Sequence, residues 1–177
     1  TPRIKSAITA GGNVILKSNS DSTISTIAAS GSCGVYFGGS ATVVINMMNN
    51  ETEAYISGSD VTAGGSVCLL ADSVNATNSY GGSIGGGAVG IGAAVVVNVI
   101  ENTTRAYSSG ANITALGNGA AITVKQWDED GNQTTQDVNG LVIIANNEEA
   151  VTIFSGSAGA GLAGVSGQVS TNMIDNI

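Results

Sequence analysis

The residue types most able to bind or react with a partner gather in one polar segment, residues 116–139. It holds the only tryptophan of the chain, Trp127, directly followed by Asp128, Glu129 and Asp130. Because Trp is enriched among the side chains that dominate binding interfaces, a Trp beside three carboxylates predicts a contact point for a partner. The alternative is that Trp127 folds down onto neighbouring strands as an apolar cover.

The same carboxylates indicate a possible weak calcium site. Asp128, Asp130 and Asp137 supply hard oxygen atoms around a turn that contains Gly131. An EF-hand loop needs glycine at its sixth position and a bidentate glutamate at its twelfth, and neither is present here. Weak Ca²⁺ binding by these three residues therefore stays open beside a simple solvated acidic turn. No other metal and no other cofactor is expected.

Catalytic chemistry has little support in the sequence. The chain has no histidine, so the commonest general base near neutral pH is missing and no Ser-His or Cys-His arrangement can form. Residues 85–90 match G-x-G-x-x-G, but a dinucleotide site needs a helix after that motif and a strand-like run follows. Carboxylate pairs for glycoside hydrolysis remain, such as Glu51 with Glu53 and Glu148 with Glu149. We predict that the chain is not an enzyme.

Composition excludes several classes of partner. The net charge is −8 with only five basic residues in 177, which disfavours nucleic acids and anionic membrane surfaces. With 42% hydrophobic residues the chain should fold rather than stay disordered. Cys33 and Cys68 are interpreted as two small buried hydrophobic residues, with a disulfide between them as the alternative.

The chain contains repeats that must position these side chains. VVINMMNNETEAY at residues 43–55 and VVVNVIENTTRAY at residues 95–107 share one skeleton, 52 residues apart. TAGGNVIL from Thr9 matches TAGGSVCL from Thr62, and VSTNMIDN at residues 169–176 is a third copy. We predict repeat units at about 9–61, 62–115 and 140–177, with an insertion at 116–139, inside a single segment covering residues 1–177. A period of this size is typical of a solenoid, propeller or array.

The local pattern selects a solenoid of β-strands. Runs such as NVILKS and AAVVVNV are β-branched and apolar over five to seven positions and then meet Gly, Asn, Ser or Asp. Helix is opposed by the Gly, Val, Thr, Asn and Ser content. We therefore predict an all-β parallel β-helix of about seven coils, each of roughly 20 to 27 residues. The insertion should leave the stack as a protruding loop or hairpin, with strands at 122–126 and 141–145 around a turn at Asp130-Gly131.

Three asparagines occupy equivalent places in the repeats: Asn46, Asn98 and Asn172. If the units stack, their side-chain amides can bond to one another along the axis as a structural ladder. The alternative is that Asn is there because it tolerates turn geometry.

The combination of a Gly-rich run, a β-branched strand, N-[VM]-[IM]-[DEN]-N and T-x-A-Y, followed by TAGG, resembles the repeats of large secreted bacterial surface proteins. These are the filamentous-haemagglutinin-like and leukotoxin-type adhesins, exported as autotransporter or two-partner-secretion passengers. The likeness covers most of residues 6–115 and 145–177. It implies a right-handed parallel β-helix at the bacterial cell surface or secreted from it, serving as stalk and adhesive surface for a receptor or glycan on a host or neighbouring cell.

Three alternatives to the adhesin remain. The beginning TPRIKSAITAGG resembles the continuation that the third copy lacks after NMIDN, so chains stacking head to tail into an extracellular filament are one possibility. A membrane-active toxin segment is the second possibility, because three segments carry no charge: 22–50, 73–100 and 150–174. They are rich in Gly, Asn, Ser and Thr, so we predict no transmembrane segment. A carbohydrate-active β-helix enzyme is the third.

Overall fold

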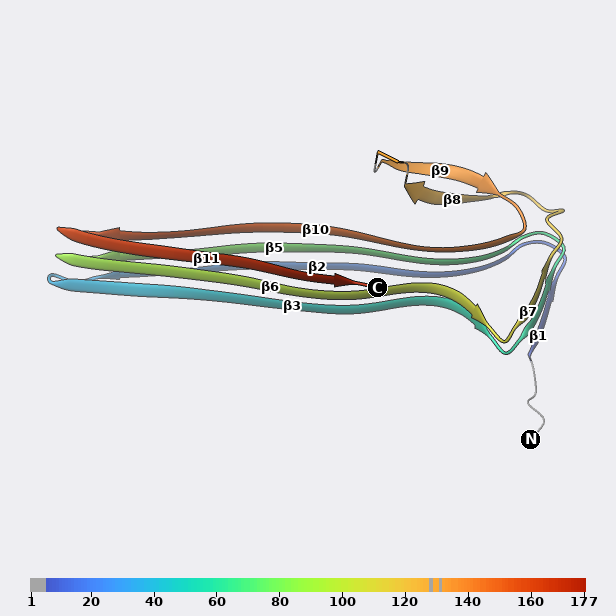
Figure 1. The fold of residues 1–177 in the computed structure, drawn as a ribbon, viewed down its shortest axis with the longest axis horizontal. Coiled ribbons are helices and arrows are strands. Elements are labelled where there is room, and N and C mark those ends of the chain that lie inside the picture. Colours follow the sequence, from blue (N-terminus) through green and yellow to red (C-terminus); the bar gives the residue numbers. More distant parts are fainter. Residues whose placement is uncertain (1–5, 128, 131) are drawn as a thin grey trace, which may run out of the picture.

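Long parallel strands make up most of the protein, as a computed structural model that describes residues 6–127, 129–130 and 132–177 shows (Figure 1). All regular elements in this part of the chain are β-strands. In chain order they are β1 (Ala7–Ala10), β2 (Val14–Cys33), β3 (Phe37–Ser57), β4 (Asp60–Ala63), β5 (Val67–Gly86), β6 (Val89–Ser109), β7 (Asn112–Ala115), β8 (Ile122–Trp127), β9 (Gln133–Val138), β10 (Leu141–Ala160) and β11 (Ala163–Asn176).

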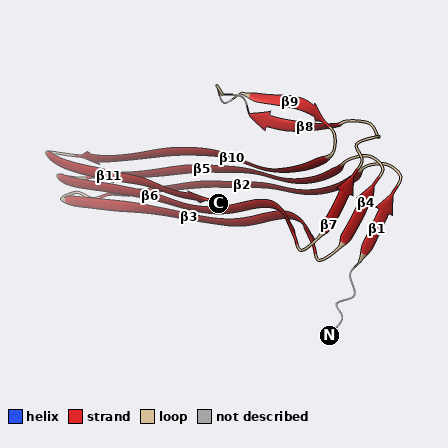
Figure 2. Cartoon of the chain, turned by 45° about the vertical axis from the view of Figure 1, so that its right-hand side comes forward, coloured by secondary structure: helices blue, strands red, loops and turns tan. Residues whose placement is uncertain are grey.

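Each repeat unit contributes one strand to each of three parallel sheets. The sheet orders are β1-β4-β7, β10-β5-β2 and β11-β6-β3. We call the strands of one unit a tier: β1, β2 and β3 form tier 1, β4, β5 and β6 form tier 2, and β7, β10 and β11 form tier 3. In each tier the chain runs out along one long strand and returns along the other, while the short strands lie together at one end (Figures 1 and 2).

The strand register follows the sequence repeat. Val14 pairs with Val67, which pairs with Leu141, so the offsets in this sheet are 53 and 74 residues. In the other long sheet Asn46 pairs with Asn98, which pairs with Asn172. Equivalent residues of successive units therefore lie directly over one another along the stacking axis.

The predicted number and length of the coils are wrong. We expected about seven coils of 20 to 27 residues, whereas each unit makes a single tier and the long strands contain 20 or 21 residues where they are complete. The reason is that Ser, Asn and Gly do not end the strands here. Ser73, Asn75 and Ser79, for example, occupy alternate positions whose side chains point between the two long sheets, so the strand continues through them.

The space between the two long sheets changes in character along the strands. Near the short strands it is apolar, with Ala54, Ile56, Val61, Val67 and Leu69 in one cluster. The middle is polar and buried, and the far end narrows to glycine. There a Cβ atom added to Gly85 would lie 2.0 Å from the Ile91 carbonyl oxygen, so the backbones of the two sheets are in direct contact.

Glycine also makes the turns from the long strands into the short ones. Gly58 and Gly110 occupy equivalent places in tiers 1 and 2, and both have a φ of 59°. This left-handed conformation is readily adopted by glycine and rarely by other residues, which explains the repeated glycine at this turn.

The insertion forms an antiparallel hairpin of β8 and β9, with Ile122 opposite Val138 (Figure 2). The predicted strand at 122–126 is present within β8. The segment at 141–145 is also a strand, but it begins β10 and pairs with β5 in the stack. The partner of β8 is instead Gln133–Val138, which we expected to belong to the polar stretch between the two strands because that stretch is rich in turn residues.

Candidate binding surfaces

The three asparagines of the repeats form a chain of hydrogen bonds between the long sheets. Asn46 Nδ2 donates to Asn98 Oδ1 at 3.1 Å, and Asn98 Nδ2 donates to Asn172 Oδ1 at 3.2 Å. Asn98 is completely buried. Asn46 and Asn98 therefore lie in the interior, where the ladder joins the three tiers, and Asn172 is exposed at the edge of tier 3.

Hydroxyl groups of the facing sheet extend this ladder. Ser79 Oγ donates to Asn98 Oδ1 at 2.8 Å and accepts from Asn46 Nδ2 at 2.7 Å, and Thr26 donates to Asn46 Oδ1 at 2.7 Å. A second set links Asn50 to Asn75 across the sheets, and Asn102 donates to Glu149. Buried polar groups are costly without partners, so these bonds allow a polar interior in the middle of the strands.

The hairpin lies over the outer face of the β10-β5-β2 sheet. Ile122 and Val124 are buried there against Cys68, with Leu70 and Val142 at the margin. Burial raises the pKa of the Cys68 thiol, the nearby Asp72 carboxylate raises it further, and Lys17 opposes the shift. The prediction of two buried cysteines is wrong for Cys33, which is exposed at the last position of β2; both thiols are free and lie far apart.

Three of the four residues predicted as a contact point lie at the tip of this hairpin. Trp127 is the last residue of β8, and Glu129 and Asp130 are exposed in the turn. The side chain of Trp127 and the whole of Asp128 lie outside the described residues. The apolar cover on the sheet is supplied by Ile122 and Val124.

Two of the three aspartates considered for calcium, Asp130 and Asp137, lie apart on the hairpin, and Asp128 lies outside the described residues. Asp137 pairs with Thr123 at the opposite end of the hairpin from Asp130 and accepts a hydrogen bond from the Thr123 hydroxyl at 2.6 Å. Within residues 6–127, 129–130 and 132–177, no three Cys, Asp or Glu side chains converge as a metal site would require.

The carboxylate pair Glu51 and Glu53 and the glycine run at residues 85–90 both take part in the stacked strands. Glu51 and Glu53 flank Arg105 of the next tier, at 3.9 and 3.7 Å from its guanidinium nitrogens. The glycine run at residues 85–90 joins the end of β5 to the start of β6. A strand follows the run, so a helix N-terminus, which a dinucleotide phosphate site requires, is not formed there.

A polar cleft opens where the hairpin overhangs the sheet. Its cavity of about 100 Å³ lies between Lys125 and Gln133 of the hairpin and Lys17, Asp72 and Glu148 of the sheet. Lys17 Nζ is 3.7 Å from Asp72, and Asn146 Nδ2 donates to the same carboxylate at 2.8 Å. Asp72 is therefore ion-paired with Lys17 and hydrogen bonded to Asn146 within the protein.

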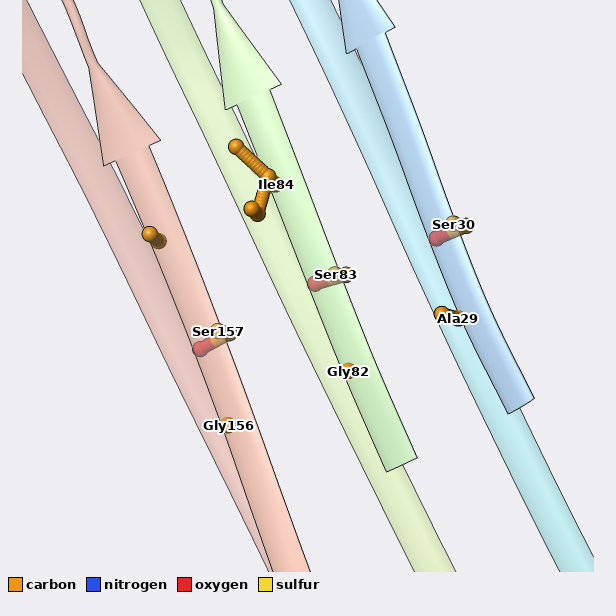
Figure 3. A pocket seen from close by; sticks show the side chains of 8 residues that line it. Ala29, Ser30, Gly82, Ser83, Ile84, Gly156 and Ser157 are labelled. Atoms are coloured by element: carbon orange, nitrogen blue, oxygen red, sulfur yellow. The ribbon is translucent and has the colours of Figure 1, made fainter. Parts of the chain in front are cut away.

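A larger and more apolar groove crosses all three strands of the same sheet (Figure 3). Its volume is about 310 Å³, and its floor is the row Ala29, Gly82 and Gly156, one small residue from each tier. Gly82 has open space above it, since an added Cβ would meet nothing closer than 4.0 Å. Ile84 stands on one side of the groove.

The row next to the floor, two residues earlier on each strand, is Ile27, Tyr80 and Phe154, which are 80%, 39% and 66% exposed. Exposed aromatic side chains beside a shallow hollow are suited to stacking against a flat ligand. Sequence reasoning missed this site. The available signal was three small residues at offsets of 53 and 74, each two positions after a large apolar residue.

No protein-family model, curated protein or solved structure matches the chain. The described part of the chain contains no helix with the length and hydrophobicity that a bilayer-spanning segment requires.

Proposed function

We propose that the chain is a structural and adhesive segment of a large extracellular bacterial adhesin. In this proposal it is a right-handed parallel β-solenoid that acts as a rigid stalk and as a binding surface for a host, cell or matrix partner. The handedness follows the general preference for right-handed crossovers between parallel strands. The chain carries no catalytic role in this account.

The observation that supports this function best is the in-register stack of tiers. Because each outward residue lies over its equivalent in the next tier, the outer faces carry straight rows of similar side chains. Such rows present the same chemistry repeatedly along the axis, as extended solenoid surfaces do. The groove beside Tyr80 and Phe154 is the proposed adhesive site, and its uncharged lining suits a neutral glycan or an apolar peptide segment.

Binding of the purified chain to immobilised partners tests this function. We expect measurable binding to at least one member of a panel of neutral glycans, sialylated glycans and extracellular-matrix proteins. Gly82→Leu fills the groove and should weaken that binding at least tenfold. Thr23→Leu, an exposed position on the same sheet, is the matched control and should bind as the unchanged protein does. Absence of binding across the panel would contradict the proposal.

A second candidate function is a filament subunit. It is favoured by the open edges of tiers 1 and 3, where side chains that face the interior are exposed along the axis. Leu141 is 51% exposed and Ile143 is 41% exposed although both point between the sheets. A second chain stacked there would extend every sheet in a contact that does not close. Sedimentation velocity would then show a series of growing species with increasing concentration.

A further inference from the structure

The outer face of the β11-β6-β3 sheet carries an extended apolar surface. It consists of the outward, alternate residues of β3 from Phe37 to Met47, of β6 from Val89 to Val99 and of β11 from Ala163 to Met173. We call this surface the apolar face. It contains 18 residues in six rows of three, all uncharged, and Thr171 is its single hydroxyl-bearing member.

The large side chains on the two outer strands of this face are well exposed, and Val95, Val97 and Val99 of the central strand β6 are half-buried. Val43, Ile45 and Met47 on β3 are 62%, 63% and 74% exposed, and Val165 and Val169 on β11 are similarly open. The hairpin does not cover them, because its buried residues Ile122 and Val124 pack on the opposite sheet. This face therefore stays apolar and in contact with solvent in the isolated chain.

The size of the apolar face fits an interface between proteins. Six rows at a repeat of about 6.8 Å and three strands about 4.8 Å apart give a flat area of about 600 Å². That is at the upper end of the largest apolar patch on an ordinary monomer. Two such faces together remove about 1,200 Å², which reaches the range of stable interfaces.

We propose that the apolar face is a dimer interface, occupied by the same face of a second copy of this chain. Most of its side chains are Gly, Ala, Val or Ile, so two copies can pack as the two sheets of a sandwich do, about 10 Å apart. This inference concerns a different sheet from the adhesive groove and does not depend on the proposed function.

The charges at the border of the face set the orientation of the two copies. The next row after Met47 is Asn49, Glu101 and Asp175, and it lies at one end of the face only. The other end meets the turns, where the exposed residues Val35, Tyr36 and Leu162 are uncharged. With the strands of the two copies parallel, Glu101 would face Glu101. With the strands antiparallel, each acidic row lies over the uncharged turns of the other copy, so we infer the antiparallel arrangement.

Sedimentation equilibrium of the whole chain tests the interface. The unchanged protein should form a dimer of twice 17.4 kDa. Val97→Lys places a charge in the middle of the face and should make the protein monomeric at the same concentration. Ala76→Lys is the matched control, at an outward position of β5 in the same tier on the opposite sheet, and should leave the dimer intact. Far-UV circular dichroism of both variants shows that each remains folded.

Cross-linking through one introduced cysteine, in a background where Cys33→Ser and Cys68→Ala remove both native thiols, tests the orientation. Antiparallel packing brings Val95 close to Val95 of the other copy, whereas two Val89 residues lie about 34 Å apart. A short bis-maleimide should therefore join Val95→Cys into dimers and leave Val89→Cys uncross-linked.

Three results would overturn the proposal. They are a strictly monomeric unchanged protein at all concentrations, a dimer that survives Val97→Lys, and equal cross-linking of Val89→Cys and Val95→Cys. Binding of monomers to phosphatidylcholine vesicles through this face would also overturn the proposal, because a lipid surface would then cover the face in place of a second copy.

Discussion

The close contact of the two long sheets at their glycine end predicts a large difference between two glycine-to-alanine substitutions three residues apart. Gly85 points toward the facing sheet, where an added Cβ would lie 2.0 Å from the Ile91 carbonyl oxygen and 2.8 Å from that of Gly38. Gly82 points outward, and the nearest atom to its added Cβ is 4.0 Å away. Neither glycine has a positive φ, so the two substitutions differ mainly in the space available.

The expected change in the free energy of unfolding follows from these distances. In Gly85→Ala the obstructing atoms belong to the backbone, so the two sheets must separate locally by more than about 1 Å. Overpacking of this kind costs typically 1–3 kcal/mol, and the rigid backbone on both sides favours the upper part of that range. Replacing glycine within a strand recovers about 0.5–1 kcal/mol of chain entropy in both variants. We expect Gly85→Ala to lower the free energy of unfolding by about 2 kcal/mol and Gly82→Ala to raise it by about 0.5 kcal/mol.

Urea unfolding followed by circular dichroism measures both values, with the slope of the transition showing whether the same surface unfolds in each variant. Thermal unfolding provides a second reading, since a change of 2 kcal/mol corresponds to about 4–8 °C for a chain of this length. Equal stability of the two variants would refute the direct packing of the sheets at residues 85 and 91.

Further predictions concern the ladder, the hairpin and the thiols. Asn98→Leu removes the partner of Asn46, Ser79 and Asn172, and should cost about 2–4 kcal/mol in urea unfolding, whereas Asn49→Leu at the exposed surface should change stability by less than about 1 kcal/mol. Val124→Ala should destabilise the hairpin by about 1–2 kcal/mol and speed the reaction of Cys68 with a thiol reagent, and an unchanged rate would argue against coverage of Cys68 by the hairpin. At pH 8 the exposed Cys33 should react much faster than Cys68. Because the pKa of Cys68 is raised in the folded protein, the contribution of this thiol to the free energy of unfolding should be constant below pH 9.0 and fall as pH rises through the folded pKa. Cys68→Ala should abolish this pH dependence.

The repeat in the sequence contained much of the fold. Parallel stacking of equivalent units follows from the matched words around Asn46, Asn98 and Asn172, and β-strands follow from their Val, Ile and Thr content. Strand length was not predictable in the same way. In the sequence, Ser73, Asn75 and Ser79 indicated the ends of strands. A polar side chain is expected in the interior only when its hydrogen-bond partner can be named. Those partners belong to the facing sheet, as Ser79 with Asn98 shows, and the sequence alone does not name them.

The binding surfaces were harder to predict than the fold. The insertion was conspicuous because it held Trp127 and a high density of charge, and the structure places its tip at the exposed end of a hairpin. The groove and the apolar face have no conspicuous residues. Both arise only when Gly82 is placed beside Gly156, or Val97 beside Thr171 and Ile45, by the stacking of tiers. Their chemistry is a property of rows across strands rather than of any stretch along the chain.

The stacking of tiers in register can be measured directly by nuclear magnetic resonance of the chain labelled with ¹⁵N and ¹³C. Scalar couplings across hydrogen bonds identify which amide donates to which carbonyl. We predict couplings that link residues 37–57 to residues 89–109 at a constant offset of 52, in the staggered pattern of parallel strands. Couplings between β2 and β3, or between β5 and β6, in the pattern of antiparallel neighbours would contradict the stacked arrangement.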